Sequence, residues 1–142
     1  MNSLPLFLIP IIVGLVTQGI KTLVDFSQKK FKWGLPSYGG MPSAHTAFAF
    51  SLATLIAVRE GFDSILFAIA AGIVIFIVDD ALRLRVFLGN HGLALNKLLS
   101  KLPEEDTKGI PKIEERLGHK WLEVIVGAIL GIGLTLTLNC FI

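Results

Sequence analysis

Four long apolar segments alternate with polar stretches along this chain, at about residues 4–24, 44–58, 65–82 and 121–142. A bilayer core of about 30 Å needs roughly 20 apolar residues per helix, and fewer where the bilayer thins. Because each segment is close to this length and nearly free of charge, the pattern predicts an all-α fold. We expect an integral membrane bundle of four transmembrane helices, formed by one domain over residues 1–142. Pro10 lies within the first segment, where it predicts a kink.

The polar stretch between the third and fourth segments contains its own helical pattern. Four leucines recur at helical spacing and alternate with two lysines: Leu95, Leu98, Leu99 and Leu102 with Lys97 and Lys101. Such a pattern is typical of an amphipathic helix that lies on the membrane surface. We therefore expect an interfacial helix between the third and fourth spans.

Composition supports the membrane interpretation and excludes several functions. The 142 residues are 53% hydrophobic and 17% charged, and their mean hydropathy is +0.71, which rules out an ordinary water-soluble domain. A net charge of +2 is too small to indicate a nucleic-acid partner. The single cysteine, Cys140, allows neither an intrachain disulfide nor a cysteine metal cluster. The first apolar segment lacks the positive leader of a secretory signal, so we expect it to be a retained span.

Four spans would place both polar stretches on one side of the membrane and both termini on the other. The short turn at residues 59–63 would lie with the termini and contains Arg59. The opposite side would hold Lys29, Lys30, Lys32, Arg83, Arg85, Lys97, Lys101, Lys108, Lys112, Arg116 and Lys120. By the positive-inside rule that side is expected to be cytoplasmic, in the plasma (inner) membrane.

The last apolar segment carries a face of small residues, Gly127, Gly131 and Gly133. Small residues let neighbouring helices approach closely. This face is expected to pack inside the bundle, and a homodimer through Gly127 and Gly131 is the alternative.

Ionisable and polar side chains collect where the predicted spans meet the cytoplasmic side. They are Lys21, Ser43, His45, Asp79, Asp80, Arg83, Arg85, His119 and Glu123. Charged residues at the edge of a span are costly, and they therefore indicate a functional site. Two histidines, several cations and carboxylates together favour acid, base or nucleophilic chemistry on an anion, and phosphate fits lysine and arginine best.

Two groups in this set have more than one interpretation. Ser43 precedes a predicted helix, so its hydroxyl could bind an oxyanion or could cap the helix without any ligand. His119 and Glu123 stand four residues apart on one helix face, where the carboxylate can hold one imidazole nitrogen and leave the other as a nucleophile. The same pair could ligate a metal, although no further ligands stand at a recognisable spacing. His91 is expected to be a loop or interfacial residue.

Several sequence blocks resemble those of a known superfamily. The run Gly-Gly-Met-Pro-Ser-Ala-His-Thr at residues 39–46 resembles the Pro-Ser-Gly-His signature of the type 2 phosphatidic acid phosphatase and vanadium haloperoxidase superfamily. It is most similar to the divergent branch of acid phosphatase/vanadium-dependent haloperoxidase-related membrane proteins. Further matching blocks are Asp80-Ala81 with Arg85, Gly89 and Leu95-Asn96, and Glu115 with Gly118-His119, Leu122-Glu123-Val124 and Gly127, and Lys21 matches the lysine that begins the site.

The resemblance implies a metal-independent phosphatase domain, without a cofactor, that works through a phosphohistidine. His119 would attack phosphorus, Glu123 would orient His119, and His45 would protonate the leaving oxygen. The phosphoryl oxygens would be held by Lys21, Ser43 and Arg85, with Asp80 orienting Arg85 or Lys21. Arg83 stands where the branch has glycine, so Arg83 is a second candidate for phosphate binding. The arginine that the larger superfamily places six residues before the histidine is Ile113 here.

The expected substrate is a lipid phosphate or a polyprenyl phosphate or diphosphate, whose tail would remain among the membrane lipids. A protein that binds or transports an anionic headgroup without cleaving it is the alternative function. A purely structural helix bundle is a third hypothesis, and it leaves the one-sided cluster unexplained.

Overall fold

The computed structural model describes residues 5–28 and 39–141. Outside these residues lie three of the lysines used to predict the membrane orientation, Lys29, Lys30 and Lys32. The predicted span ends at residues 4 and 142 also lie outside them. The described part is helical and contains no strand. Its elements are α1 (Leu8–Ser27), α2 (Ala44–Glu60), α3 (Ile65–Asp79), the π-helical turn η1 (Asp80–Leu84), α4 (Arg85–Leu99), the one-turn α5 (Glu104–Thr107) and α6 (Trp121–Asn139).

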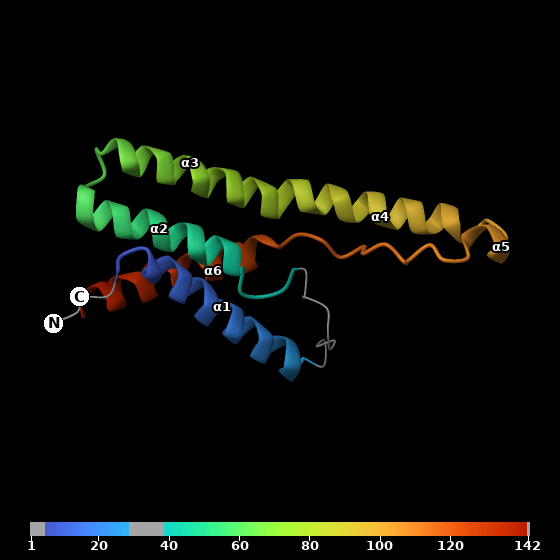
Figure 1. Cartoon of the computed structure of the whole chain (residues 1–142), viewed down its shortest axis with the longest axis horizontal. Helices are drawn as coiled ribbons and strands as arrows, with labels where there is room; N and C mark the ends of the chain where they lie inside the picture. The colour runs from blue at the N-terminus through green and yellow to red at the C-terminus, as the bar shows by residue number, and fades with distance from the viewer. Residues whose placement is uncertain (1–4, 29–38, 142) are drawn as a thin grey trace.

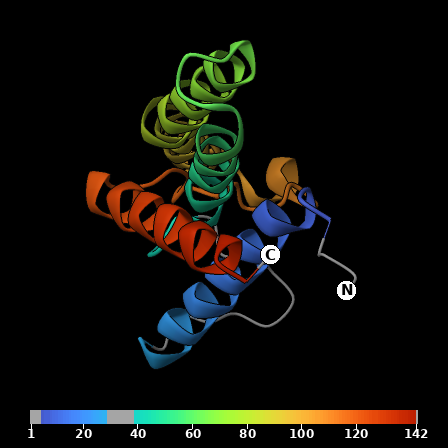
Figure 2. The ribbon, with the colours of Figure 1, turned by 90° about the vertical axis from the view of Figure 1, so that its left-hand side faces the viewer.

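Helix α2 forms the centre of the bundle and packs against α1, α3 and α6. Seen from its end, the bundle has α3 on one side of α2, and α6 and α1 on the other (Figure 2). Its buried face contains Ala47, Ala49 and Ala53, and these small side chains let the neighbouring helices come close. Helix α1 begins, and α6 ends, at the end of the bundle where α2 turns into α3 (Figure 1).

The glycine face of α6 is occupied by α2. A Cβ on Gly127 would stand 2.5 Å from the carbonyl oxygen of Ser43, and one on Gly131 would collide with the backbone of Ala47. Farther along the same interface, the fully buried Ser51 and Thr135 hydroxyls bond each other at 2.5 Å. This is the intramolecular packing expected for these glycines, and it leaves Gly127 and Gly131 covered within one chain.

Three helices of the described residues are long and apolar enough to cross a membrane: Leu8–Ser27, the continuous helix Ile65–Leu99 and Trp121–Asn139. Helix α2 has 17 residues. Its position between α1, α3 and α6 buries one face along most of its length.

The helix that begins in the third apolar segment does not end near residue 82 as predicted. Helices α3 and α4 are joined through η1 into one helix of 35 residues and are nearly collinear in Figure 1. The predicted amphipathic residues therefore extend the third helix, where a separate surface helix was expected. The sequence permits this continuity, because no proline, the strongest interruption of a helix, stands within residues 65–99.

Pro10 does not interrupt α1. The helix begins at Leu8, so Pro10 falls in its first turn. Amide groups there have no acceptor within the helix, and the missing N–H of proline costs little. The predicted kink therefore has no structural basis at this position.

Candidate active site

The starts of α2 and α6 are joined through their backbones. The amide of Ser43 donates to the carbonyl oxygen of Glu123 at 3.1 Å. In the preceding loops, Gly39 has a φ of 83°, and a Cβ there would stand 2.6 Å from the carbonyl oxygen of Gly118. Only glycine satisfies both this backbone conformation and this approach. The two loops therefore meet at one place.

The segment before α6 runs back along α4 and brings His119 to the bundle. Gly89 and Gly92 of α4 let this segment approach, since a Cβ on either would stand 2.6 Å from a carbonyl oxygen of residues 114–115. Asn96 fixes the segment by donating to the Ile113 carbonyl at 2.8 Å and accepting from the Ile113 amide at 3.1 Å. At the end of this path, the His119 amide donates to the carbonyl oxygen of Ala81 in η1 at 2.9 Å.

The His119 imidazole is held in one orientation by Glu123. Its Nδ1 lies 3.0 Å from Glu123 Oε2, and the same oxygen accepts the amide of Lys120 at 3.0 Å. The His119 side chain is only 5% exposed. With Nδ1 bonded to the carboxylate, Nε2 is the nitrogen that remains for chemistry.

Burial lowers the pKa of His119 from its ordinary value of 6.5. The hydrogen bond and the negative charge of Glu123 act in the opposite direction, and the positive charges of Lys21 and Arg85 lower the pKa further. The net effect favours the neutral imidazole, which is the form that can act as a nucleophile.

The π-helical turn determines which arginine faces this histidine. Arg85 Nε donates to Asp80 Oδ2 at 2.6 Å. Two side chains five residues apart lie side by side only in a turn that is wider than the turn of an α-helix. Arg83 instead pairs with Asp79 at 3.3 Å, and the Arg83 side chain is 70% exposed. Arg85 contributes to the electrostatics of His119, His45 and Lys21, and Arg83 is not among the charges acting on any of the three.

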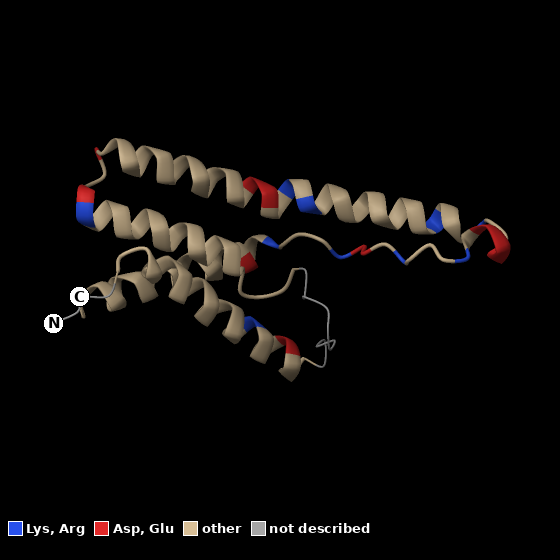
Figure 3. Cartoon of the chain, in the orientation of Figure 1, with Lys and Arg blue, Asp and Glu red and all other residues tan. Residues whose placement is uncertain are grey.

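His45 and Lys21 complete the cluster from two further helices. His45 is exposed at the start of α2 and interacts electrostatically with Arg85, His119, Lys21 and Asp80. Lys21 lies in the second half of α1, 5% exposed, and interacts with Asp25, Glu123 and Arg85. Figure 3 shows charged residues on α1, at the α3–α4 junction and at the start of α6, while most of α3 and most of α6 carry no charge.

Ser43 has the N-cap position of α2, but its side chain makes no hydrogen bond to the helix backbone. The hydroxyl is fully buried and lies 2.9 Å from the Thr46 hydroxyl. Helix capping by the side chain is therefore not what Ser43 does in this structure. The N–H groups in the first turn of α2 have no acceptor within the helix, and they point toward the end of α2 at which the cluster lies.

The structure thus brings together Lys21, His45, Asp80, Arg85, His119 and Glu123. The Ser43 amide bonds the Glu123 carbonyl oxygen, while the Ser43 hydroxyl is buried against Thr46. The structure places Arg83 away from this group, and His91 is exposed farther along α4. Two features escaped the sequence analysis. The π turn leaves no recognisable pattern, and the function of Asn96 depends on a chain segment 17 residues away.

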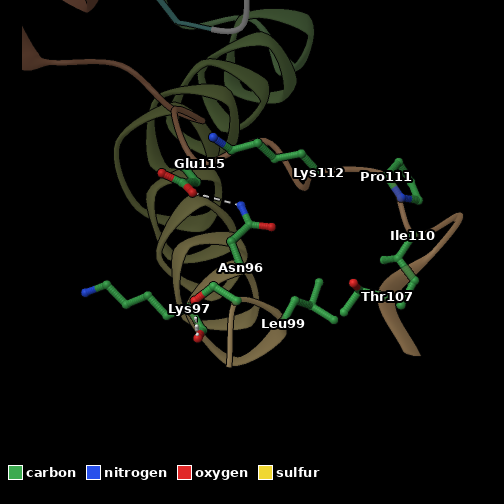
Figure 4. Close-up of a pocket in the computed structure, with 9 residues that line it drawn as sticks. Asn96, Lys97, Leu99, Thr107, Ile110, Pro111, Lys112 and Glu115 are labelled. Carbon is green, nitrogen blue, oxygen red and sulfur yellow. Dashed lines mark hydrogen bonds between the residues drawn. The ribbon is translucent and has the colours of Figure 1, made fainter. Parts of the chain in front are cut away.

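Two hollows on the molecule lie away from this cluster. One, of about 460 Å³, lies between the end of α4 and residues 107–115, where Asn96 also bonds Glu115 at 2.8 Å (Figure 4). The other, of about 420 Å³, is lined mostly by apolar residues at the opposite end of α1 and α2. Among the described residues, no three His, Cys, Asp or Glu side chains are grouped so as to hold a metal ion. The His119–Glu123 pair therefore gains no third ligand of these kinds from that part of the chain.

The sequence profile of the Divergent PAP2 family matches residues 3–134. The chain belongs to this family. It is also 36% identical over 137 residues to a protein named "Uncharacterized membrane protein YuiD" from Bacillus subtilis strain 168, a match that covers 87% of each chain. No solved structure matches the chain. Membership of the Divergent PAP2 family, this relative and the three apolar helices make the chain an integral membrane protein.

Proposed function

We propose that this member of the Divergent PAP2 family is a phosphatase that hydrolyses a lipid phosphate, or a polyprenyl phosphate or diphosphate, through a phosphohistidine. The observation that carries the proposal is the state of His119. Its Nδ1 is held by Glu123, its pKa is lowered, and it lies within the electrostatic reach of Lys21, Arg85 and His45. A protein that only grips a headgroup needs the cations but no oriented imidazole.

In the proposed reaction, Nε2 of His119 attacks phosphorus and forms a P–N bond while the P–O bond to the lipid breaks. His45 donates its proton to the departing oxygen. Water then attacks phosphorus, the P–N bond breaks, and its electron pair returns to Nε2. His45 takes up the proton that water releases, which restores both histidines.

The phosphoryl oxygens would be stabilised by fixed positive groups from three helices. Lys21 supplies charge from α1, and Arg85 supplies the terminal nitrogens of a guanidinium whose Nε is held by Asp80. The amides at the start of α2 would add donors, and Ser43, at the N-cap position of α2, is a further candidate for binding a phosphoryl oxygen. Groups that are in place before the reaction need no reorganisation as charge develops, which is the main source of such catalysis.

We also propose that α2 is a fourth span, shielded by its neighbours, and that the cluster faces the cytoplasm at the inner membrane. Seventeen residues of helix are about 25 Å long, a little less than a bilayer core. A site at this depth would receive a headgroup from the lipid–water boundary while the tail remains in the bilayer.

The direct test is phosphate release by the purified protein in detergent from a panel of lipid phosphates, with and without EDTA and with vanadate as a mimic of five-coordinate phosphorus. We expect metal-independent turnover that vanadate inhibits, and an acid-labile phosphoryl group on His119 after rapid quenching. His119→Ala should abolish both signals.

His91→Ala is the matched control, because His91 is exposed and remote from the cluster, and it should keep phosphate release within about twofold. Wild-type turnover by His119→Ala would refute the assignment. Headgroup binding without turnover across the whole panel would favour the non-catalytic alternative.

A further inference from the structure

An exposed apolar stripe runs along α4 and the residues that flank it, and no segment that the structure describes covers it. The stripe consists of Leu84 at the end of η1, Leu88, Leu95 and Leu98 of α4, and Leu102 just past the helix, which are 47–60% exposed, with the exposed His91 at its centre. The spacing is four, three, four, three and four residues, which is the a/d repeat of a coiled coil and predicts a second helix packed along it. None of these residues belongs to the candidate active site.

No segment within residues 5–28 and 39–141 covers the stripe. Another side of α4 is already occupied by residues 113–117, which pack on Gly89 and Gly92 and bond Asn96. The small-residue face of α6 is likewise occupied, because α2 covers Gly127 and Gly131. Within the described residues, the stripe is therefore a long, regular face that is open to association.

We propose that a second copy of this chain covers the stripe, so that two α4 helices pair as a short parallel coiled coil. The inference rests on α3 crossing the membrane. A 35-residue helix is about 52 Å long and a bilayer core is about 30 Å thick, so a collinear α4 extends roughly 20 Å beyond the bilayer. Leucines on that extension would otherwise face water.

The membrane determines how the two copies meet. Both have the same orientation in the bilayer, so a two-fold axis that relates them lies along the membrane normal. Two α4 helices that extend along this axis are parallel and in register, and each core residue faces its own counterpart. Confinement to one membrane in one orientation also raises the effective concentration, which offsets the weakness of so short a coiled coil.

His91 favours a second helix over a lipid surface as the partner. If α4 lay on the membrane, the centre of its apolar face would enter the acyl region together with the imidazole, and burying a polar group there is costly. A coiled coil tolerates one polar core position, which sets register and oligomeric state at some cost in stability. His91→Leu is therefore expected to strengthen association and to weaken its restriction to two chains.

The test uses cross-linking of the full-length protein in its native membrane. In a Cys140→Ser background, Leu95→Cys should give a covalent dimer with a short bifunctional maleimide. Leu93→Cys is the matched control, because Leu93 lies on the opposite side of α4 and is also exposed (38%), and it should give at least tenfold less dimer.

A second measurement uses light scattering of the detergent-purified protein. Wild type and Leu93→Glu should be dimeric, and Leu95→Glu should raise the dissociation constant at least tenfold with the same helical content by circular dichroism. A monomeric wild type, equal cross-linking at residues 93 and 95, or a Leu95→Cys thiol that is shielded by lipid without cross-linking would overturn the proposal. Phosphate release is a separate readout, since each group of the proposed active site comes from one chain.

Discussion

One additional residue in the turn between α3 and α4 determines which side chains face the candidate site. In an α-helix Asp80 and Arg85 would point in different directions, but in the π turn they bond at 2.6 Å. The same turn presents the carbonyl oxygen of Ala81 to the His119 amide. A local change in helix geometry thus positions a cation and the backbone of the proposed nucleophile together.

The two arginines of this turn provide a matched pair of variants. Arg85→Ala should lower phosphate release by about 10²–10³-fold, the usual cost of removing one preorganised donor to a developing charge. Arg83→Ala should change it less than about twofold, because that side chain is 70% exposed and paired with Asp79. Steady-state kinetics on one lipid phosphate would measure both. Equal losses would show that the π turn does not separate the two side chains.

The lowered pKa of His119 predicts a dependence on pH. Burial and nearby cations depress the pKa below 6.5 in the folded protein, so the unfolded chain binds more protons than the folded one between that pKa and 6.5. The free energy of unfolding that depends on His119 is therefore at its full value above about pH 6.5. It decreases as the pH falls from there through the pKa of the folded protein. NMR titration of labelled histidines, with His119→Ala to assign the resonance, should give a midpoint below 6.5.

The variant Arg85→Ala tests whether the positive charge of Arg85 helps to lower the pKa of His119. Removing a nearby positive charge should move the His119 midpoint toward higher pH. A midpoint that stays in place would mean that Arg85 does not act on this imidazole.

At the scale of the elements, close contact between α2 and α6 keeps the two sides of the site together. The starts of the two helices share the hydrogen bond from Ser43 to Glu123. Gly127 and Gly131 allow the helices to approach, and the Ser51–Thr135 bond lies farther along the same interface. Separation of these helices would therefore move His45 away from His119.

Substitutions along α6 test this packing. Gly131→Val should destabilise the protein by about 1–3 kcal/mol, because the new side chain would overlap the backbone of Ala47. Gly133→Val is the control, since nothing lies within 4 Å of a Cβ at that position. Thermal unfolding in detergent would compare them. Equal melting temperatures would argue against the α2–α6 contact.

At the scale of the whole molecule, the proposed four-span arrangement would give α1 and α2 opposite directions through the bilayer. In a Cys140→Ser background, Gln28→Cys and Asp63→Cys should be labelled by a membrane-impermeant maleimide from opposite sides. Labelling of both from the same side would show that α2 does not cross. Labelling of Gln28→Cys from the cytoplasmic side would support the proposed orientation.

Much of this architecture could be predicted from the sequence because apolar length and charge are properties of local segments. The second helix was expected at residues 44–58 and extends from Ala44 to Glu60, and the i, i+4 relation of His119 and Glu123 follows from helix geometry alone. The continuity of α3 with α4 was missed although no proline interrupts it. The π turn and the bonds from Asn96 to Ile113 could not be found in this way, because tertiary contacts determine both.

The π turn has a genetic consequence. Deletion of a single residue within positions 81–84 would remove the extra residue that the wider turn accommodates and would restore an ordinary helix. Asp80 and Arg85 would then stand four residues apart, a spacing at which side chains also meet, so their ion pair could persist. The carbonyl oxygen that the π turn presents to the His119 amide would return to the hydrogen bonds of the helix. A three-nucleotide deletion is thus expected to loosen the anchor of the proposed nucleophile while it leaves the neighbouring cation paired.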